Sequence, residues 1–248
     1  MPSLKKANIR LLTAIVIVAV VGGIVVGCLQ DATPVDVPQD GIIPGGSIPP
    51  IDSSAPAQTE TATFALGCFW APDSIFGSLD GVIRTRVGYA GGTTENPTYH
   101  NLGDHTETIQ IDYDPAQISY EELLETYWAS HNPTGQPWSR QYISIIFYHD
   151  SDQRELAAES KQSEEDSLGR EVYTEITPFS EFYLAEDYHQ KYYLQREPEI
   201  MEELAAIYPN FADFLDSTAV ARINGYVGGH ATFEELQAQL DSSWSVSG

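Results

Sequence analysis

The sequence predicts an α+β fold: a two-layer sandwich built on a split β-α-β (ferredoxin-like) mixed sheet, followed by a helical C-terminal extension. Two observations support this prediction. Strand-like and helix-like segments follow one another between Thr61 and Ile176 in the order β-α-β-β-α-β-α-β. With 42% apolar residues, the chain of 248 residues can also bury a sizeable core.

The first half of this pattern contains three strands and one helix. Thr61–Leu66 is predicted as a strand and Trp70–Leu79 as a helix. The first turn of this helix tolerates Pro72, because the N–H that proline lacks would have no helical partner there. Val82–Tyr89 and Glu107–Tyr113 alternate in character, as expected for strands with one buried face.

The second half adds two helices and two strands. Ser119 and Glu122 form a capping-box pattern at the start of a helix. Tyr142–Tyr148 is predicted as an apolar strand, Asp152–Leu168 as a polar amphipathic helix and Val172–Ile176 as a short strand.

The C-terminal extension, residues 197–248, is expected to pack on the domain before it. It contains two helix-like pieces, Glu199–Ile207 and Thr232–Leu240. Between them, Asn224–Gly229 echoes the sequence of Val87–Gly92, but two short copies do not indicate a repeat.

Acidic residues dominate the charge of the chain. There are 36 Asp and Glu against 12 Lys and Arg, a formal net charge of −24. Such a surface repels polyanions, which argues against nucleic acid and anionic membrane surfaces as partners of the folded part. Two interpretations stay open: adaptation to high salt, in which screening weakens self-repulsion, and an ordinary acidic extracytoplasmic protein.

Residues 1–28 are predicted to be a signal peptide or membrane anchor. Three basic residues precede the uncharged apolar run Leu11–Val26, which has the length of a signal core. The run ends in Val25–Cys28, which resembles a lipobox, so Cys28 is the expected lipidation site. An uncleaved anchor over Ile9–Leu29 is the alternative. Both predict a membrane-anchored protein with its folded part on the extracytoplasmic face.

Residues 29–60 are predicted to be a disordered, proline-rich linker. Prolines recur throughout this stretch among Asp, Gly and Ser residues. Because proline removes backbone donors and restricts φ, regular helices and strands are not expected here.

The predicted folded part contains a single cysteine. Cys68 lies between the strand 61–66 and the helix 70–79. A lone cysteine is more often an inert apolar residue, but a helix N-terminus stabilises a thiolate, which suits a nucleophile. The cysteine count excludes a disulfide scaffold, and without a Cys-x-x-Cys pair it argues against a zinc site.

Seven short motifs occur in order along the chain. They are Gly67–Trp70, Gly88–Gly92, Asn96–Tyr99, His105–Glu107, His131–Pro133, Gln141-Tyr142 and Ala185–Gln190. Together they resemble the peptide methionine sulfoxide reductase A family over roughly Thr61 to Leu194. The resemblance implies that residues 61–196 are the catalytic domain of an oxidoreductase, a peptide-methionine (S)-S-oxide reductase. The preference for the S epimer rests on the resemblance alone.

The resemblance also implies catalytic roles. Reduction of a sulfoxide needs a soft nucleophile for the sulfur and an acid for the departing oxygen. At the matched positions Cys68 is the nucleophile and Glu107 the acid, with Tyr99 and Tyr142 as hydrogen-bond donors. A buried carboxyl stays protonated near neutrality. Without the resemblance, Glu107 would be interpreted as an exposed strand residue.

Further residues match the family's substrate-binding positions. Phe69 and Trp70 correspond to the apolar cup for the S-methyl group, and Tyr192 corresponds to a family tyrosine that donates a hydrogen bond in the same pocket. By position alone, the first two would be core residues at a helix start. The amides of Phe69 and of the first turn are expected to stabilise the Cys68 thiolate, whereas Asp73 would raise the pKa of the thiol if it faced the sulfur.

Two departures from the family pattern affect these expectations. Residues 134–140 are shorter than in many relatives and contain no acid, so an aspartate found there in relatives has no counterpart. The tail Asn224–Gly229 lacks the second cysteine with which many relatives resolve the sulfenic acid. The prediction is a one-cysteine enzyme without bound cofactor or metal, whose Cys68 is reduced by an external thiol, thioredoxin-like or small.

Two other functions stay open from the sequence. One is a non-catalytic lipoprotein that binds methionine sulfoxide or peptides, and the other is a thiol peroxidase, because a cysteine of low pKa also reacts with peroxide. The expected partners are oxidised proteins or free methionine sulfoxide, the thiol reductant and the membrane. Nucleic acid is not expected, and the protein is expected to be a monomer.

Overall fold

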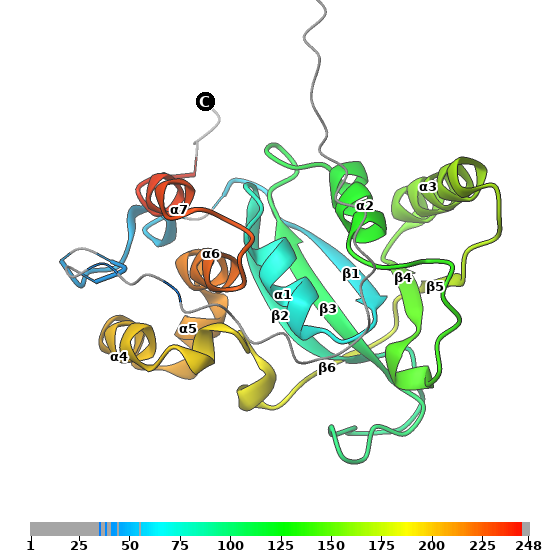
Figure 1. Ribbon diagram of the computed structural model, residues 1–248, viewed down its shortest axis with the longest axis horizontal. Helices are drawn as coiled ribbons and strands as arrows, with labels where there is room; N and C mark the ends of the chain where they lie inside the picture. Colours follow the sequence, from blue (N-terminus) through cyan, green and yellow to red (C-terminus); the bar gives the residue numbers. More distant parts are fainter. Residues whose placement is uncertain (1–34, 36–37, 39–40, 44, 55, 245–248) are drawn as a thin grey trace, which may run out of the picture. The chain divides into compact units, whose positions relative to one another are not determined.

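The computed structural model of the chain describes residues 35, 38, 41–43, 45–54 and 56–244 (Figure 1). The predicted signal segment with Cys28, and most of the predicted linker before residue 41, lie outside these residues, so the anchor and the lipidation stay predictions. Within the described part, no helix combines the length and the apolar character needed to cross a membrane.

A six-stranded mixed sheet forms the framework (Figure 1). Its strands are β1 (Glu60–Leu66), β2 (Val82–Ala90), β3 (Thr106–Tyr113), β4 (Ser144–Tyr148), β5 (Thr174–Pro178) and β6 (Phe182–Leu184). They lie in the order β5-β4-β1-β3-β2-β6. In this sheet β4 pairs with β5 in parallel and the other neighbours are antiparallel, so β1 and β2 run in the same direction on either side of β3.

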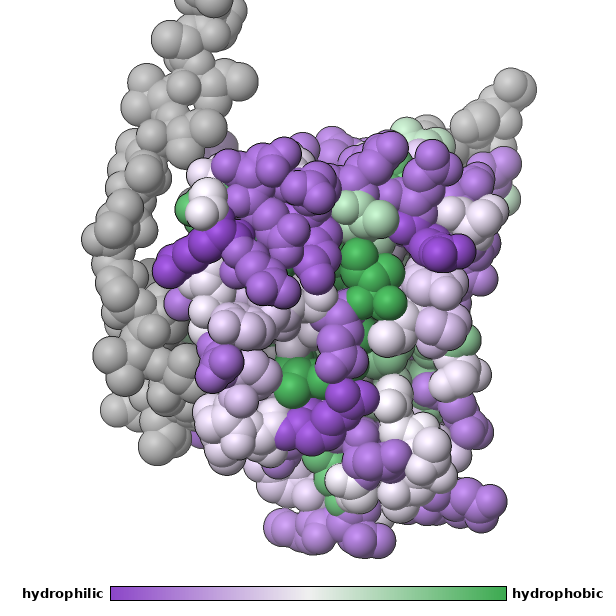
Figure 2. All heavy atoms as spheres, turned by 90° about the vertical axis from the view of Figure 1, so that its right-hand side faces the viewer, coloured by the Kyte–Doolittle hydropathy of each residue, from purple (hydrophilic) through white to green (hydrophobic). Residues whose placement is uncertain are grey.

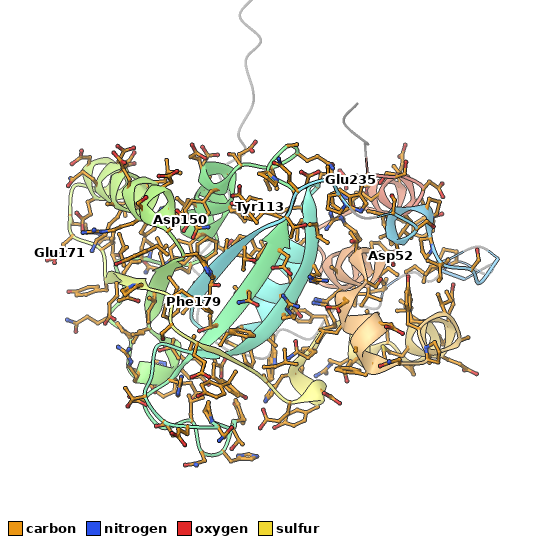
Figure 3. The ribbon with its side chains drawn as sticks, turned by 180° about the vertical axis from the view of Figure 1, so that it is seen from behind. Asp52, Tyr113, Asp150, Glu171, Phe179 and Glu235 are labelled. Carbon is orange, nitrogen blue, oxygen red and sulfur yellow. The ribbon has the colours of Figure 1, made fainter. Side chains whose placement is uncertain are left out.

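Three helices pack on one face of the sheet: α1 (Trp70–Gly77), α2 (Tyr120–Ala129) and α3 (Ser151–Leu168). Phe76, Leu123 and Ala157 of these helices form one core with Phe64 and Ile109 of the sheet. Seen from behind, β1 and β3 are not covered by any helix of the described chain (Figure 3). Most of α3 is exposed, and the side that carries it is largely hydrophilic with small apolar patches (Figure 2).

The alternation of β3 decides which of its side chains face the helices. Ile109, Ile111 and Tyr113 belong to the core beneath the helices and are fully buried. Because side chains in a strand alternate with a period of two, Glu107 projects to the same face near one end of the strand. The alternation of side chains in β3 therefore places the Glu107 carboxylate on the face of the sheet that the helices cover.

Local signals define the ends of α2 and α3. The predicted capping box is confirmed, since the Ser119 side chain accepts from the Glu122 amide and the Glu122 side chain accepts from the Ser119 amide. At the start of α3, Asp150 accepts hydrogen bonds from two amides of the first turn. The helix ends at Gly169, whose φ of +65° favours glycine.

Four further helices follow the sheet: α4 (Pro198–Ile207), α5 (Phe211–Asp216), α6 (Thr218–Val227) and α7 (Phe233–Leu240). Glycines allow α6 to lie very close to α1. A Cβ atom on Gly77 would lie 2.7 Å from the carbonyl oxygen of Ala221, and one on Gly225 would lie 2.6 Å from the Cβ of Ser78. The glycines that the sequence places in the tail thus serve helix packing.

The prediction of a disordered linker over residues 29–60 is wrong for residues 41–43 and 45–54. Ile42 and Ile51 are buried in a second core, formed with α4, α6 and α7. The Asp52 carboxylate accepts hydrogen bonds from the amides of Thr218 and Ala219 at the start of α6 (2.8 and 3.2 Å; Figure 3). A short 3-10 turn tolerates proline, and the isoleucines between the prolines supply the apolar contact.

The α+β class is confirmed, and the other differences from the predicted elements are local. The last predicted strand, Val172–Ile176, is displaced by two residues as β5, and β6, α5 and α6 were not predicted. β6 has only three residues, which is too few for a periodic pattern, and Gly225 inside α6 lowers the helix propensity of that segment. Short 3-10 helices span Pro50–Asp52, Arg140–Tyr142, Asp187–His189 and Leu194–Arg196.

Candidate active site

Cys68 lies in the short connection between β1 and α1, directly before Phe69, which is the N-cap residue of α1. The preceding Gly67 has a φ of +99°, a conformation that is strained for residues with a side chain. The thiol is partly exposed. The connection therefore places it at the N-terminal end of a helix, where the helix dipole favours the thiolate.

The Glu107 carboxylate is buried beside the start of α1, with 2% of the residue exposed. Its Oε2 accepts a hydrogen bond from the Phe69 amide (3.1 Å), and its Oε1 accepts one from the side-chain amide of Gln141 (2.7 Å). Burial raises the pKa of Glu107 to about 7, although both hydrogen bonds act to lower it. Near neutral pH this carboxyl is present both with and without its proton.

Two groups that were expected to influence Cys68 have partners elsewhere in the protein. The Phe69 amide, expected to stabilise the thiolate, donates to Glu107. Asp73 is fully buried, and its carboxylate is held by the backbone amide and the ammonium group of Lys191 (2.8 and 2.7 Å). The negative charge of Asp73 is therefore compensated within the protein by Lys191.

Phe69 and Trp70 form an aromatic surface next to Cys68. Phe69 is buried, and Trp70 is partly exposed. Tyr192 stacks on Trp70, with ring centroids 3.7 Å apart and planes 4° apart. The indole N–H of Trp70 donates to Nδ1 of His189 (3.2 Å), and burial lowers the pKa of His189. A neutral imidazole thus accepts this hydrogen bond and fixes the indole.

Tyr99 meets the same surface from the loop between β2 and β3. Its ring centroid lies 4.6 Å from that of His189, and its backbone amide donates to Glu186 (3.0 Å). Glu186 also accepts a hydrogen bond from the Tyr89 hydroxyl (2.7 Å). Sequence reasoning gave Glu186 no role, although the motif Ala185–Gln190 could have indicated it.

Tyr142 lies in the 3-10 helix Arg140–Tyr142, next to Gln141. Its ring centroid is 5.0 Å from that of Trp138, a side chain that is 77% exposed. The guanidinium group of Arg140 donates to two backbone carbonyls of the loop between β2 and β3 (3.2 and 3.3 Å). Residues 134–140, the segment that is short and lacks an acid, are therefore attached to the loop between β2 and β3 by the positively charged side chain of Arg140.

The predicted residues that lie around the start of α1 are Cys68, Phe69, Trp70, Tyr99, Glu107 and Tyr192. Tyr142 is connected to them through its neighbour Gln141, whose amide contacts Glu107. Sequence reasoning assigned no role to Gln141 or Lys191, because their partners are distant in the chain. The chemical roles of all these residues stay predictions.

Two clefts lie elsewhere. One, of about 470 Å³, is bordered by Ile48, by residues 51–54 and by α4, α5 and α6, and the other, of about 550 Å³, lies between α2 and α3. Neither is lined by Cys68 or Glu107. The candidate active site is therefore identified by its chemistry rather than by the size of a hollow.

A family model described as peptide methionine sulfoxide reductase matches residues 60–223. The match begins at the first residue of β1 and ends within α6. It includes every predicted site residue of the catalytic domain, from Cys68 to Tyr192.

Individual relatives agree with this match. The peptide methionine sulfoxide reductase of Drosophila melanogaster is 42% identical over 186 residues, which cover 73% of this chain and 74% of that protein. Peptide methionine sulfoxide reductase A5 of Oryza sativa subsp. japonica is 44% identical over 180 residues, 70% of each chain.

Solved structures give the same result. Methionine sulfoxide reductase A of Corynebacterium diphtheriae is 30% identical, with a TM-score of 0.53, and the alignment covers 68% of this chain and 91% of that one. Mxr1 from Saccharomyces cerevisiae in reduced form is 29% identical, with a TM-score of 0.54 and coverage of 58% and 89%.

Proposed function

The chain belongs to the peptide methionine sulfoxide reductase family of oxidoreductases, and on that basis we propose how its own residues reduce methionine sulfoxide. Cys68 attacks the sulfur of the sulfoxide, and Glu107 protonates the departing oxygen. One observation carries this proposal: the buried carboxyl of Glu107, with its pKa near neutrality, contacts the amide of the residue that follows Cys68.

The reaction moves one oxygen atom from the substrate to the enzyme. The Cys68 thiolate attacks the sulfoxide sulfur and forms a sulfur–sulfur bond while the oxygen takes a proton. The hydroxyl group then transfers to the Cys68 sulfur, the sulfur–oxygen bond of the substrate and the sulfur–sulfur bond break, and Cys68 is left as a sulfenic acid. Two electrons pass from Cys68 to the substrate, which leaves as methionine. The proton on the new sulfenic acid comes from Glu107, so one negative charge is present before the step, on sulfur, and one after it, on the carboxylate.

The aromatic residues bind the substrate. Phe69, Trp70 and Tyr192 receive the S-methyl group, while the hydroxyl groups of Tyr99 and Tyr142 donate hydrogen bonds to the sulfoxide oxygen. The fixed orientation of Trp70, stacked on Tyr192, supports this assignment. We assign the S epimer as the substrate, in oxidised proteins or as the free amino acid.

Cys68 is reset from outside the chain. One external thiol, thioredoxin-like or small, attacks the sulfenic acid and releases water, which leaves a mixed disulfide, and a second thiol releases Cys68. The tail supports this proposal because it contains no cysteine, and its Gly225 is packed closely against Ser78 at the end of α1. Cys28 is the only other cysteine in the chain.

Two further proposals concern architecture and location. The β1-α1-β2 and β3-α2-β4 connections, with strand order β4-β1-β3-β2, support the assignment of a split β-α-β sandwich. The basic and apolar N-terminal sequence supports attachment to a membrane with the folded part on its extracytoplasmic face.

A single-turnover experiment tests the function. The protein is mixed with a peptide that carries the separated S or R epimer of methionine sulfoxide, without reductant, and is examined by intact-mass spectrometry. We expect the S epimer alone to add one oxygen atom to the wild type and to yield one methionine per enzyme. Cys68→Ser should gain no oxygen, while Cys28→Ser should behave as the wild type. With dithiothreitol or thioredoxin, turnover should continue.

Three outcomes would contradict parts of this proposal. Oxygen transfer from neither epimer would contradict the function. A disulfide between Cys28 and Cys68 after turnover would contradict reduction by an external thiol alone. A reaction with peroxide faster than that with the sulfoxide would favour a thiol peroxidase.

A further inference from the structure

Lys191 is a buried cation that the proposed reaction does not use. None of its surface is exposed. In the sequence it lies between His189 and Tyr192, which both contact Trp70 of the aromatic surface. Lysine is very rarely buried completely unless it is paired. Its position therefore calls for a physical explanation.

All the donors of Lys191 are directed at two residues. Its Nζ donates to Oδ1 of Asp73 (2.7 Å), to the backbone oxygen of Thr85 (2.6 Å) and to Oγ1 of Thr85 (2.7 Å). Its backbone amide donates to Oδ2 of Asp73 (2.8 Å). Asp73 belongs to α1 and Thr85 to β2, so one side chain joins this segment to both elements.

The backbone of Lys191 is strained to make these contacts. Its φ is +51°, and Asn96 is the other non-glycine residue of the described chain with a positive φ. Such a conformation is unfavourable for an L-residue and persists only where the surroundings impose it. Here it turns the amide and the ammonium group towards the same carboxylate.

A gain in stability does not explain the buried ion pair of Lys191 and Asp73. Burial lowers the pKa of Lys191, and the facing Asp73 carboxylate opposes this shift. Replacing a buried ion pair by apolar residues is often neutral or stabilising, whereas the pair specifies geometry. The role of this ion pair therefore lies in the residues whose positions it fixes.

The residues around Lys191 hold the aromatic surface. His189 accepts the indole N–H of Trp70, and Tyr192 stacks on the same indole. Gln190 exchanges hydrogen bonds with both backbone groups of Val87 in β2 (3.0 and 2.8 Å). Within this segment Lys191 is bound to the helix that carries Trp70, through Asp73 in its first turn.

We propose that Lys191 is a positioning residue for substrate binding. By tying the segment 189–192 to Asp73, it holds His189 and Tyr192 against Trp70, so that the surface for the S-methyl group exists before the substrate arrives. This inference rests on the proposed function, because it takes this surface to be the substrate-binding one.

The test compares Lys191→Met with a control at another buried cation. Arg222 is 1% exposed and donates to the carbonyls of Gly77 and Val82 (2.6 Å each), at the other end of α1. Both Lys191→Met and Arg222→Met should lower the melting temperature. Only Lys191→Met should raise the KM for the sulfoxide, by about tenfold, with kcat changed less than about threefold.

A double-mutant cycle shows whether Lys191 acts through Tyr192. If it does, the effects of Lys191→Met and Tyr192→Leu on KM should not multiply, because the second change removes what the first displaces. If Lys191→Met does not fold, Thr85→Val takes its place, since it removes one acceptor of Nζ and keeps the ion pair. We expect Thr85→Val to raise KM by about threefold.

The outcomes separate this inference from the proposed function. A wild-type protein that reduces neither epimer would refute the function. An active wild type, with Lys191→Met or Thr85→Val at wild-type KM, would overturn the positioning role. So would an equal rise of KM in Arg222→Met, or multiplicative effects in the cycle.

Discussion

At the scale of single residues, Glu107 and Cys68 have different proposed roles, Glu107 as the acid and Cys68 as the nucleophile. A glutamate on an exposed strand is ionised at neutral pH, but burial against α1 raises the pKa of Glu107 to about 7. Its two hydrogen-bond donors, the Phe69 amide and Gln141, oppose this shift and fix the orientation of the carboxylate. Cys68 remains partly exposed, as the proposed attack on the substrate and reduction by an external thiol require.

The proton on Glu107 predicts how the reaction depends on pH. In the proposed mechanism the protonated form of Glu107 is the active acid, so single-turnover reduction should slow as the pH rises through about 7 and Glu107 loses its proton. Glu107→Gln should lower the rate by about 10²–10⁴-fold and remove this alkaline decline. Stopped-flow measurement of methionine release from pH 5 to pH 9 provides both results.

Glu60→Gln is the matched control for that experiment. Glu60 is another strand glutamate, but it is exposed, accepts a hydrogen bond from Tyr113 and lies at the opposite end of β1 from Cys68. It should keep the wild-type profile. A decline near pH 7 that persists in Glu107→Gln would assign the titration to another group.

At the scale of elements, α1 is the part that the rest of the protein holds in place. Its first turn, which follows Cys68, is bound through Asp73 to Lys191. The glycine contact between α1 and α6 brings the two backbones close together. Since Cys68 and Trp70 lie at the start of α1, the position of this helix decides the geometry of the site.

Gly77→Ala tests the contact between α1 and α6. The new Cβ would lie 2.7 Å from the carbonyl oxygen of Ala221, so the helices must separate. We expect a loss of about 2 kcal/mol in the free energy of unfolding, because overpacking outweighs the better helix propensity of alanine. Urea denaturation measures the loss, and the reductase rate should fall as α1 shifts.

Gly169→Ala provides the comparison. Gly169 has a φ of +65° and no atom within 4 Å of an added Cβ, so only backbone strain opposes this change. It should cost about 1 kcal/mol without an effect on the reductase rate. Equal effects of the two variants on the rate would argue against a special role of the α1–α6 contact.

At the scale of the molecule, residues 41–54 and the C-terminal helices form a second core. The Glu203 carboxylate accepts hydrogen bonds from the amides of Ile42 and Ile43, and Trp244 donates to the carbonyl of Ile51. These contacts join parts of the chain that lie 160 or more positions apart. The segment before the sheet is therefore part of the fold.

Truncation tests this second core. A chain that begins at residue 57 loses the buried Ile42, Ile43 and Ile51, each worth about 1.5–3 kcal/mol of apolar burial. Its melting temperature should fall by about 10 °C or more. A chain that begins at residue 35 keeps the segment and should melt as the full-length protein does. Equal melting of the two truncated chains would show that the segment contributes nothing.

Local patterns explain which predictions from the sequence succeeded. The capping box of Ser119 and Glu122 and the alternation of β3 are set by neighbouring residues, so periodicity and spacing reveal them. The prediction of a disordered linker failed over residues 41–43 and 45–54. The many prolines of this segment indicate disorder, whereas its isoleucines are buried by contacts with the C-terminal helices. No local pattern reports such a contact.

The sequence alone determined the order of the main elements, the placement of Cys68 between a strand and a helix, and a set of motifs that indicates the family. The tertiary structure decided the state of the site. It buried Glu107, which raises its pKa, and it paired Asp73 with Lys191, 118 residues away. The physical reason is that burial and ion pairing depend on which distant segments meet, whereas periodicity records only what neighbouring residues prefer.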